Sequence, residues 1–190
     1  LVRNFYNGTS GTELKGKKLG IHAFGQVGRN VARIAKGFGM EVYAFDPYCP
    51  AEAIEAEGVK PITDINEMYS TCQYISLHIP ATPETKKSIN YNLLKQMPKG
   101  AVLINTARKE VIDEEELVKL MEDRADFKYI SDIKPDNASV FAEKFEGRYF
   151  FTPKKMGAQT AEANINAGIA AAKQSVGFLK EGIDKFKVNK

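Results

Sequence analysis

Residues 18–28 have the sequence Lys18-Leu19-Gly20-Ile21-His22-Ala23-Phe24-Gly25-Gln26-Val27-Gly28, and apolar side chains then recur at Val31, Ile34, Ala35 and Phe38. The apolar run over residues 18–24 is typical of a short buried strand, and the later spacing is that of a helix. A glycine-bearing turn between a strand and a helix places free backbone amides where a diphosphate can bind. This stretch therefore predicts the first strand–turn–helix unit of a dinucleotide-binding sheet.

The turn differs by one residue from the G-x-G-x-x-G pattern of such sites, because Ala23 stands at the first glycine. We expect Gly25 to let the pyrophosphate approach the backbone and Gly28 to allow close packing of helix on strand. Gln26 and Val27 lie in the same turn and are predicted cofactor contacts. Ala23 must make the tight turn itself, and we expect it to do so with a negative φ.

Asp46 follows Gly28 by 18 residues, at the end of a second predicted strand over residues 41–45. A carboxylate at this place can accept hydrogen bonds from the adenosine ribose hydroxyls, and it would repel a 2′-phosphate. The pattern therefore favours NAD over NADP. The alternative is that Asp46 caps the turn before Pro47 and touches no ligand.

Short apolar strands alternate with helices along most of the chain. Further strands are predicted over residues 74–77, 101–105, 127–133 and 148–152, and helices over residues 64–70, 90–97, 113–124 and 159–180. This alternation predicts an α/β fold of the Rossmann type, a doubly wound parallel sheet with helices on both faces. We expect a lead-in strap over residues 1–16, a Rossmann domain over 17–182, and a return toward a second domain over 183–190.

Composition narrows the class of protein. The 190 residues are 43% hydrophobic and 27% charged, which suits one globular domain, and the net charge of +3 is too small to indicate nucleic-acid binding. No apolar run approaches the roughly 20 residues that span a membrane. Cys49 and Cys72 have no accompanying histidine ligand set, so we expect no metal site and a reducing, cytoplasmic location. The chain begins without Met, which indicates a piece of a longer protein.

Four further segments carry conspicuous polar residues: Leu77-His78-Ile79-Pro80-Ala81-Thr82-Pro83-Glu84-Thr85, Asn105-Thr106-Ala107-Arg108 with Val111-Ile112-Asp113-Glu114-Glu115, Ser131-Asp132-Ile133, and Thr152-Pro153 with Gly157-Ala158-Gln159-Thr160-Ala161-Glu162-Ala163. In order and spacing they resemble the motifs of the D-isomer-specific 2-hydroxyacid dehydrogenases. Together with the glycine turn, the resemblance covers residues 13–164.

The resemblance implies an NAD-dependent oxidoreductase that oxidises a small 2-hydroxy acid to the 2-oxo acid. Within the family the chain is most similar to the branch that acts on 3-phosphoglycerate in serine biosynthesis. Members have a second, substrate-binding domain and form homodimers through the nucleotide-binding domain, and this chain matches the nucleotide-binding domain alone. The alternative is a dinucleotide-sensing or corepressor-like module, because the same fold serves that role too.

The resemblance also implies which residues line the cofactor. His78 and Pro80 would form a wall beside the adenosine, and Thr85 would donate its hydroxyl to the pyrophosphate. Asp132 would hold the nicotinamide carboxamide. The remaining implied contacts are Asn105, Thr106, Ala107 and Gly157.

The same resemblance implies the catalytic residues. Arg108 comes directly after a strand, and its planar guanidinium suits a bidentate grip on a substrate carboxylate; a surface arginine paired with Glu110 or Asp113 is the alternative. The family's histidine base is replaced by Lys155, with Lys154 as a second candidate.

Two further polar residues, Asp136 and His22, have no role assigned so far. The family's orienting glutamate falls on Asn137, so the neighbouring Asp136 is the candidate for that role. His22 lies inside the first strand, and we expect it to be a buried structural histidine.

Overall fold

The computed structural model describes residues 11–155, 157 and 159–185. The chain forms two compact units, Leu1–Pro153 and Lys154–Lys190. This division falls inside the domain predicted over residues 17–182. The predicted strap over residues 1–16 is described only from residue 11, where it contains no helix or strand, and residues 186–190 of the predicted return lie outside the described part.

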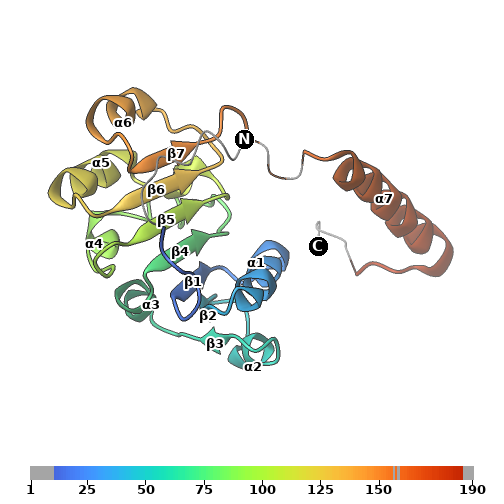
Figure 1. Cartoon of the computed structure of the whole chain (residues 1–190). Helices are drawn as coiled ribbons and strands as arrows, with labels where there is room; N and C mark the ends of the chain where they lie inside the picture. The colour runs from blue at the N-terminus through green and yellow to red at the C-terminus, as the bar shows by residue number, and fades with distance from the viewer. Residues whose placement is uncertain (1–10, 156, 158, 186–190) are drawn as a thin grey trace. The chain divides into compact units, whose positions relative to one another are not determined.

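The first unit contains a sheet of seven parallel strands in the order β3-β2-β1-β4-β5-β6-β7 (Figure 1). The strands are β1 Lys18–His22, β2 Glu41–Phe45, β3 Lys60–Pro61, β4 Tyr74–Leu77, β5 Val102–Asn105, β6 Lys128–Ser131 and β7 Tyr149–Phe151. The order reverses beside β1, which pairs with both β2 and β4. The predicted Rossmann fold is confirmed, and a reversal of this kind is where such sheets bind ligands, at the carboxyl ends of the strands.

Six helices connect these strands, and a seventh forms most of the second unit. They are α1 Gln26–Gly37, α2 Ala51–Glu55, α3 Ile65–Thr71, α4 Tyr91–Leu94, α5 Glu114–Asp123, α6 Ala138–Lys144 and α7 Ala161–Glu181, with a 3₁₀ turn over Lys109–Val111. The sequence analysis did not predict α2, α6 or β3. With five and two residues, α2 and β3 are too short for a hydrophobic period to show. Helix α6 has seven residues, as many as the predicted α3, and was missed.

Side chains of β1 alternate between two hydrophobic clusters, one on each face of the sheet. Leu19 and Ile21 pack with α1, α2 and β2. On the other face a Cβ on Gly20 would lie 2.6 Å from Ile75 Cδ1, so α3 and β4 press directly on the backbone there. The second cluster continues beneath α4, α5 and α6. Both clusters fix β1, and therefore fix the turn that follows it.

The second unit is mainly α7. Thr160 caps its first turn by accepting a hydrogen bond from Ala163 N at 3.0 Å, and Gly182 ends it with φ of 67°. None of its residues is buried, and Ile165, Ile169, Val176 and Leu179 are among its exposed apolar side chains.

Ala23 overturns one expectation. Its φ is +77°, in the left-handed region, where we expected a negative value. The reason is that the chain must turn sharply out of β1 while Ala23 N still donates to Phe45 O at 2.9 Å, as if β1 continued. An L-residue in this conformation is strained, and for this reason glycine is usual here.

Replacing Ala23 by Gly is expected to raise the free energy of unfolding by about 1 kcal/mol, because glycine adopts this φ without strain. Urea unfolding measures the change. The matched control is Ala32→Gly inside α1, which should lower the free energy of unfolding by about 1 kcal/mol or more. A loss of stability in both variants would contradict the left-handed conformation of Ala23.

Candidate active site

The N-terminus of α1 has no side-chain cap. Gly25 is its N-cap residue, no side chain caps it, and its first turn carries no acidic residue. By contrast α3, α4 and α5 are capped by the side chains of Asp64, Asn90 and Asp113. The first amides of α1 are therefore available to an anion, and the helix dipole favours one there.

The two glycines of this turn meet different surroundings. A Cβ on Gly28 would lie 2.5 Å from Ala23 O and 3.0 Å from Ile21 Cγ2, so only glycine allows α1 to approach β1 this closely. A Cβ on Gly25 would meet nothing within 4 Å. Gly25 thus presents bare backbone to open space at the helix N-terminus, which is what a diphosphate group needs.

Asp46 holds two turns together. Its Oδ2 accepts a hydrogen bond from Phe24 N at 2.7 Å, and its Oδ1 accepts one from Tyr48 N at 2.8 Å. Asp46 therefore does cap the turn at Pro47, as one part of the alternative predicted. Each carboxylate oxygen can accept a second hydrogen bond, so Asp46 remains able to receive ribose hydroxyls while it braces the turns.

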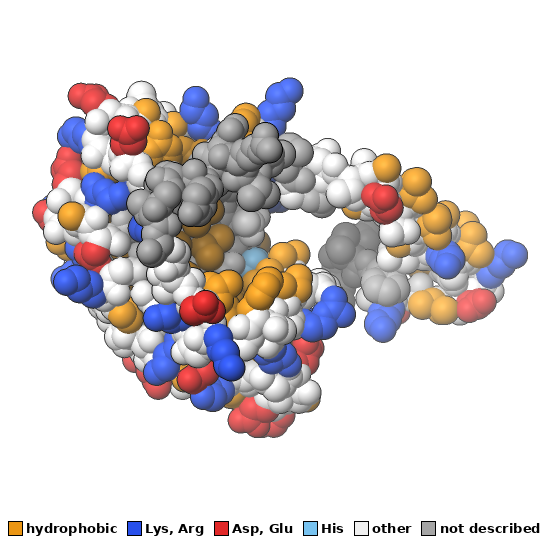
Figure 2. All heavy atoms as spheres, viewed as in Figure 1, with side chains coloured by type: hydrophobic (Ala, Val, Ile, Leu, Met, Phe, Trp, Pro, Cys, Tyr) orange, Lys and Arg blue, Asp and Glu red, His pale blue; other side chains and the backbone are white. Residues whose placement is uncertain are grey.

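A cavity of about 600 Å³ lies beside these turns, between the carboxyl ends of β1, β2 and β4. We call it the large cavity. Its walls are mostly apolar, and a histidine is visible among apolar side chains in the recess of Figure 2. The lining includes His22, Ala23, Gly25, Phe45, Asp46, Pro47, Tyr48, Ile65, His78, Ile79, Pro80, Thr82, Thr85 and Leu93. Such a pocket suits a flat heterocycle with a few polar groups at its rim.

Both histidines of the chain line the large cavity in neutral form. Burial lowers the pKa of His22 to about 4 and the pKa of His78 to about 4. His22 Nδ1 lies 3.1 Å from the Tyr69 hydroxyl, and His78 Nε2 lies 3.0 Å from Ser76 Oγ. The two histidines therefore add no charge to the cavity at neutral pH, and its charged lining residues are Asp46 and Glu84.

A second cavity, of about 430 Å³, shares three residues with the first, namely His78, Ile79 and Pro80. We call it the Arg108 cavity, because Arg108 lines its far side together with Val27, Ala81, Thr106 and Ala107. The two cavities form one groove along the carboxyl ends of the strands. The structure thus brings together four predicted parts of the site. They are the glycine turn, Asp46, the loop over residues 78–85 (the proline-rich loop) and the segment after β5.

Asn105 requires a correction. Its side chain is fully buried, with an exposed fraction of 0%, so it does not line the groove as expected. Instead, Nδ2 donates to Arg108 O at 3.0 Å, and Oδ1 accepts from Ala107 N at 3.0 Å. Asn105 shapes the turn that presents Thr106, Ala107 and Arg108, and it uses the amide of its side chain to do so.

Arg108 is exposed at the end of that turn. One guanidinium N–H donates to Ala107 O at 3.0 Å. The alternative of a surface ion pair is not found in the part of the chain that the structure describes, since Asp113 pairs with Lys87 at 3.4 Å and Arg108 forms no ion pair there. A cation without a protein counter-charge at the rim of a groove is suited to bind an anionic ligand.

Thr85 is occupied within its own loop. Its hydroxyl donates to Pro80 O at 2.6 Å and accepts from Thr82 N at 2.8 Å. A hydroxyl has one proton, so Thr85 could donate to a pyrophosphate only after leaving Pro80. In this conformation Thr85 braces the loop that carries His78 and Pro80.

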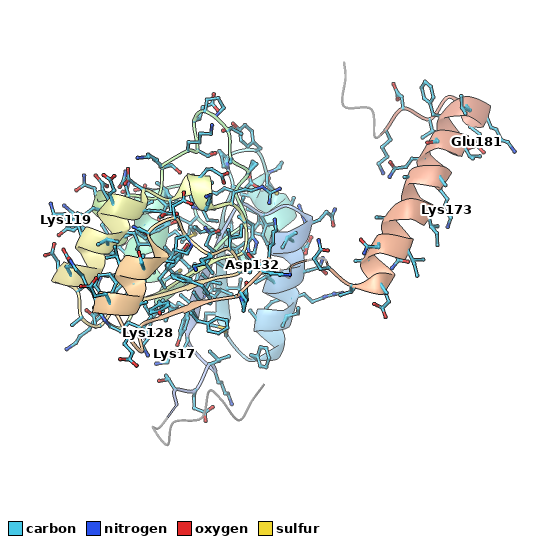
Figure 3. The ribbon with its side chains drawn as sticks, turned by 90° about the horizontal axis from the view of Figure 1, so that it is seen from above. Lys17, Lys119, Lys128, Asp132, Lys173 and Glu181 are labelled. Atoms are coloured by element: carbon cyan, nitrogen blue, oxygen red, sulfur yellow. The ribbon has the colours of Figure 1, made fainter. Side chains whose placement is uncertain are left out.

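Asp132 follows β6 and carries an unsatisfied group (Figure 3). Its Oδ1 is buried and has no hydrogen-bond partner among the described residues. Its backbone is held on both sides, since Asp132 N donates to Asn105 O at 3.2 Å and Thr152 Oγ1 donates to Asp132 O at 2.7 Å. A buried carboxylate oxygen without a donor is costly, so this atom is suited to an amide N–H of a ligand.

Asp136 lines neither the large cavity nor the Arg108 cavity, and its role as the orienting residue stays a prediction. Its Oδ1 pairs with Lys109 Nζ at 2.6 Å, its side chain is 79% exposed, and it lines a different cavity with Glu114. Glu114 Oε2 accepts from Asp136 N and from Asn137 N at 2.9 and 3.2 Å, which ties this loop to α5. Burial is the largest influence on Glu114 and raises its pKa.

Lys154 and Lys155 begin the second unit, where both are exposed, as is Gly157. Their roles remain predictions that rest on the sequence. Among the described residues no group of three or more histidine, cysteine or acidic side chains could hold a metal ion. In the same part of the chain no helix is long and apolar enough to cross a membrane.

The model of the D-isomer specific 2-hydroxyacid dehydrogenase NAD-binding domain matches residues 3–142. The chain belongs to this family. As its NAD-binding domain it takes NAD as cofactor, and its relatives are NAD-dependent oxidoreductases. The fit is visible in the open N-terminus of α1, the bare backbone at Gly25 and the unpaired oxygen of Asp132.

Several 2-hydroxyacid dehydrogenases are similar over nearly the whole chain. D-3-phosphoglycerate dehydrogenase of Methanocaldococcus jannaschii is 35% identical over 94% of this chain and 34% of the relative. The chloroplastic D-3-phosphoglycerate dehydrogenase 2 of Arabidopsis thaliana is 38% identical over 94% of this chain and 29% of the relative. The crystal structure of NAD⁺-bound 3-phosphoglycerate dehydrogenase from Entamoeba histolytica is 46% identical, with a TM-score of 0.87, over 99% of this chain and 60% of that one. The chain therefore spans about a third of the length of these curated relatives.

The neutral histidines predict acid sensitivity. The pKa of His22 is about 4 in the fold against an ordinary 6.5, so the unfolded chain binds more protons between these values, and stability is lost as the pH falls from about 6.5 toward 4. We expect His22 to contribute about 2 kcal/mol to this loss between pH 7 and pH 4.5. In urea unfolding at both pH values, His22→Gln should reduce the loss by that amount. An equal loss in the variant would contradict a neutral buried His22.

Proposed function

We propose that the full-length protein oxidises 3-phosphoglycerate to 3-phosphohydroxypyruvate with NAD. Relatives that carry the name D-3-phosphoglycerate dehydrogenase support the substrate, and the dehydrogenase motifs of the sequence support the reaction. The proposal rests above all on Arg108, an exposed cation that lines the Arg108 cavity and has no ion pair among the residues that the structure describes. A sensor or corepressor-like module would have no need of such a group.

The groove suggests how the cofactor lies. Adenosine would occupy the large cavity, with its ribose on Asp46 and the pyrophosphate on the amides that follow Gly25. The nicotinamide end would lie in the Arg108 cavity. Asp132 Oδ1 is buried and lines neither cavity, so it would receive the carboxamide after its side chain turns toward the cofactor. The groove supports this order because Asp46 and Arg108 lie at opposite ends of it. When bound, NAD supplies the acceptor for the hydride of the substrate's carbinol carbon.

The chain's own residues would then provide three functions. Arg108 binds the substrate carboxylate through parallel N–H bonds and stabilises the developing oxo group. Asn105 holds the turn of Arg108 in place from beneath. Lys155 takes the hydroxyl proton as the general base. Asp136, next to Asn137 at the position of the family's glutamate, stays the candidate for orienting the base.

The proposal also includes a second domain, a dimer and a cellular location. A substrate-binding domain, continuous with residues 183–190, would complete the cleft and supply the groups that bind the substrate phosphate. We propose a homodimer formed through the nucleotide-binding domain, as in the family. Free thiols at Cys49 and Cys72 support a reducing compartment, for which we propose the cytoplasm, although the Arabidopsis thaliana relatives are named chloroplastic.

The experiment that tests this function is turnover by the full-length protein. Arg108→Gln should lower kcat/KM for 3-phosphoglycerate by about a hundredfold or more, because one bidentate charged contact is lost in the transition state. The binding of NADH, followed by its fluorescence, should change little. Lys86→Gln, a change of a cation outside both cavities, is the matched control. Faster turnover of lactate or glyoxylate than of the phosphorylated pair would contradict the proposed substrate.

The base is tested by two neighbouring substitutions. In the full-length protein Lys155→Ala should lower kcat by about a hundredfold or more while NADH still binds, since a general base contributes on this scale. Lys154→Ala, one residue earlier, should change kcat by a few-fold at most. The opposite order of effects would transfer the base to Lys154, and two active variants would exclude both lysines.

A further inference from the structure

His22 lies between the hydrophobic core and the large cavity. Its exposed fraction is 9%, yet it lines the cavity together with Phe45 and Asp46. On its inner side Nδ1 lies 3.1 Å from the hydroxyl of Tyr69, a fully buried residue of α3 that does not line the cavity. One ring nitrogen is therefore engaged by the core, and the other remains for the cavity.

The hydrogen bond to Tyr69 determines where the imidazole carries its proton. Within the described residues the Tyr69 hydroxyl has His22 Nδ1 as its hydrogen-bond partner. If Nδ1 were the donor, the hydroxyl proton of Tyr69 would be buried without an acceptor, which is unfavourable. Tyr69 therefore donates to Nδ1. A neutral imidazole that accepts at Nδ1 carries its proton on Nε2.

Burial supports this form, because it lowers the pKa of His22 to about 4 and keeps the ring neutral at pH 7. Aromatic neighbours also hold the ring in one orientation. Its centroid lies 5.6 Å from that of Phe45 and 6.0 Å from that of Tyr69, both in edge-to-face arrangements. Nε2–H is thus a fixed donor that has no hydrogen-bond partner among the described residues.

We propose that His22 reads the cofactor's base by donating a hydrogen bond from Nε2 to a ring nitrogen of adenine. Tyr69 acts as a positioning residue, since its hydroxyl selects the tautomer that can donate. Adenine offers acceptor nitrogens on its edges, and the other walls of the large cavity are mainly apolar. The inference rests on the proposed placement of adenosine in the large cavity.

Binding of the two halves of the cofactor tests the role of His22. We expect His22→Phe to weaken the binding of AMP and of NADH by this chain by about five- to tenfold, the effect of one neutral hydrogen bond in a shielded site. The binding of reduced nicotinamide mononucleotide should be unchanged. Calorimetric titration measures all three, and urea unfolding verifies that the variant is folded. Equal AMP affinity in the folded variant would overturn the inference and leave the proposed function intact. Failure of the unaltered chain to bind either NADH or AMP would overturn the adenosine placement and the inference with it.

The tautomer gives a readout that a purely structural histidine would not give. In ¹⁵N spectra the free protein should show His22 protonated at Nε2, with a shift of that nitrogen when AMP binds. Tyr69→Phe removes only the hydroxyl, so it should allow both tautomers and weaken AMP binding by about two- to threefold. A His22 that is protonated at Nδ1 in the free protein would overturn the proposal.

Discussion

The close approach of α1 to the end of β1 is the constraint on which the site depends. There is no room for a side chain at Gly28, because its Cβ would lie 2.5 Å from the carbonyl oxygen of Ala23. That oxygen points at the helix because Ala23 adopts a left-handed conformation. If either residue changed its geometry, the open N-terminus of α1 would move away from the point where the strand order reverses. The strain at Ala23 is therefore located where the backbone must meet a ligand.

Several polar side chains of the site bind the protein's own turns. Asp46 joins the turns after β1 and β2, Asn105 shapes the turn after β5, and Thr85 braces the proline-rich loop. Loops at the carboxyl edge of a sheet have no ladder to fix them, so side-chain hydrogen bonds to backbone take over that function. The loops that line the groove are thus tied to their own backbone before a cofactor arrives, and such preorganisation lowers the entropic cost of binding.

Charge in the groove is concentrated at its two ends. His22 and His78 are neutral because burial lowers their pKa values, and most of the other wall residues are apolar. The carboxylates of Asp46 and Glu84 line the large cavity, and the Arg108 guanidinium lines the other cavity. Arg108 has no ion pair among the described residues, so its charge is available to an anionic ligand. The overall net charge of +3 is of little consequence by comparison.

The sequence alone determined the fold class, the glycine turn, the strand-end position of Asp46 and the family, because these depend on short-range period and on motif spacing. It could not reveal the conformation of Ala23, which follows from pairing between β1 and β2, or the five-residue helix α2, which has no visible period. Only the tertiary structure decided that Asn105 is buried, that Asp136 pairs with Lys109 and that His22 lines the large cavity. The physical reason is distance along the chain: the His22–Tyr69 and Lys109–Asp136 partners lie 47 and 27 positions apart. Asn105 makes local hydrogen bonds, but it is buried because β5 lies between β4 and β6, and no local pattern records that.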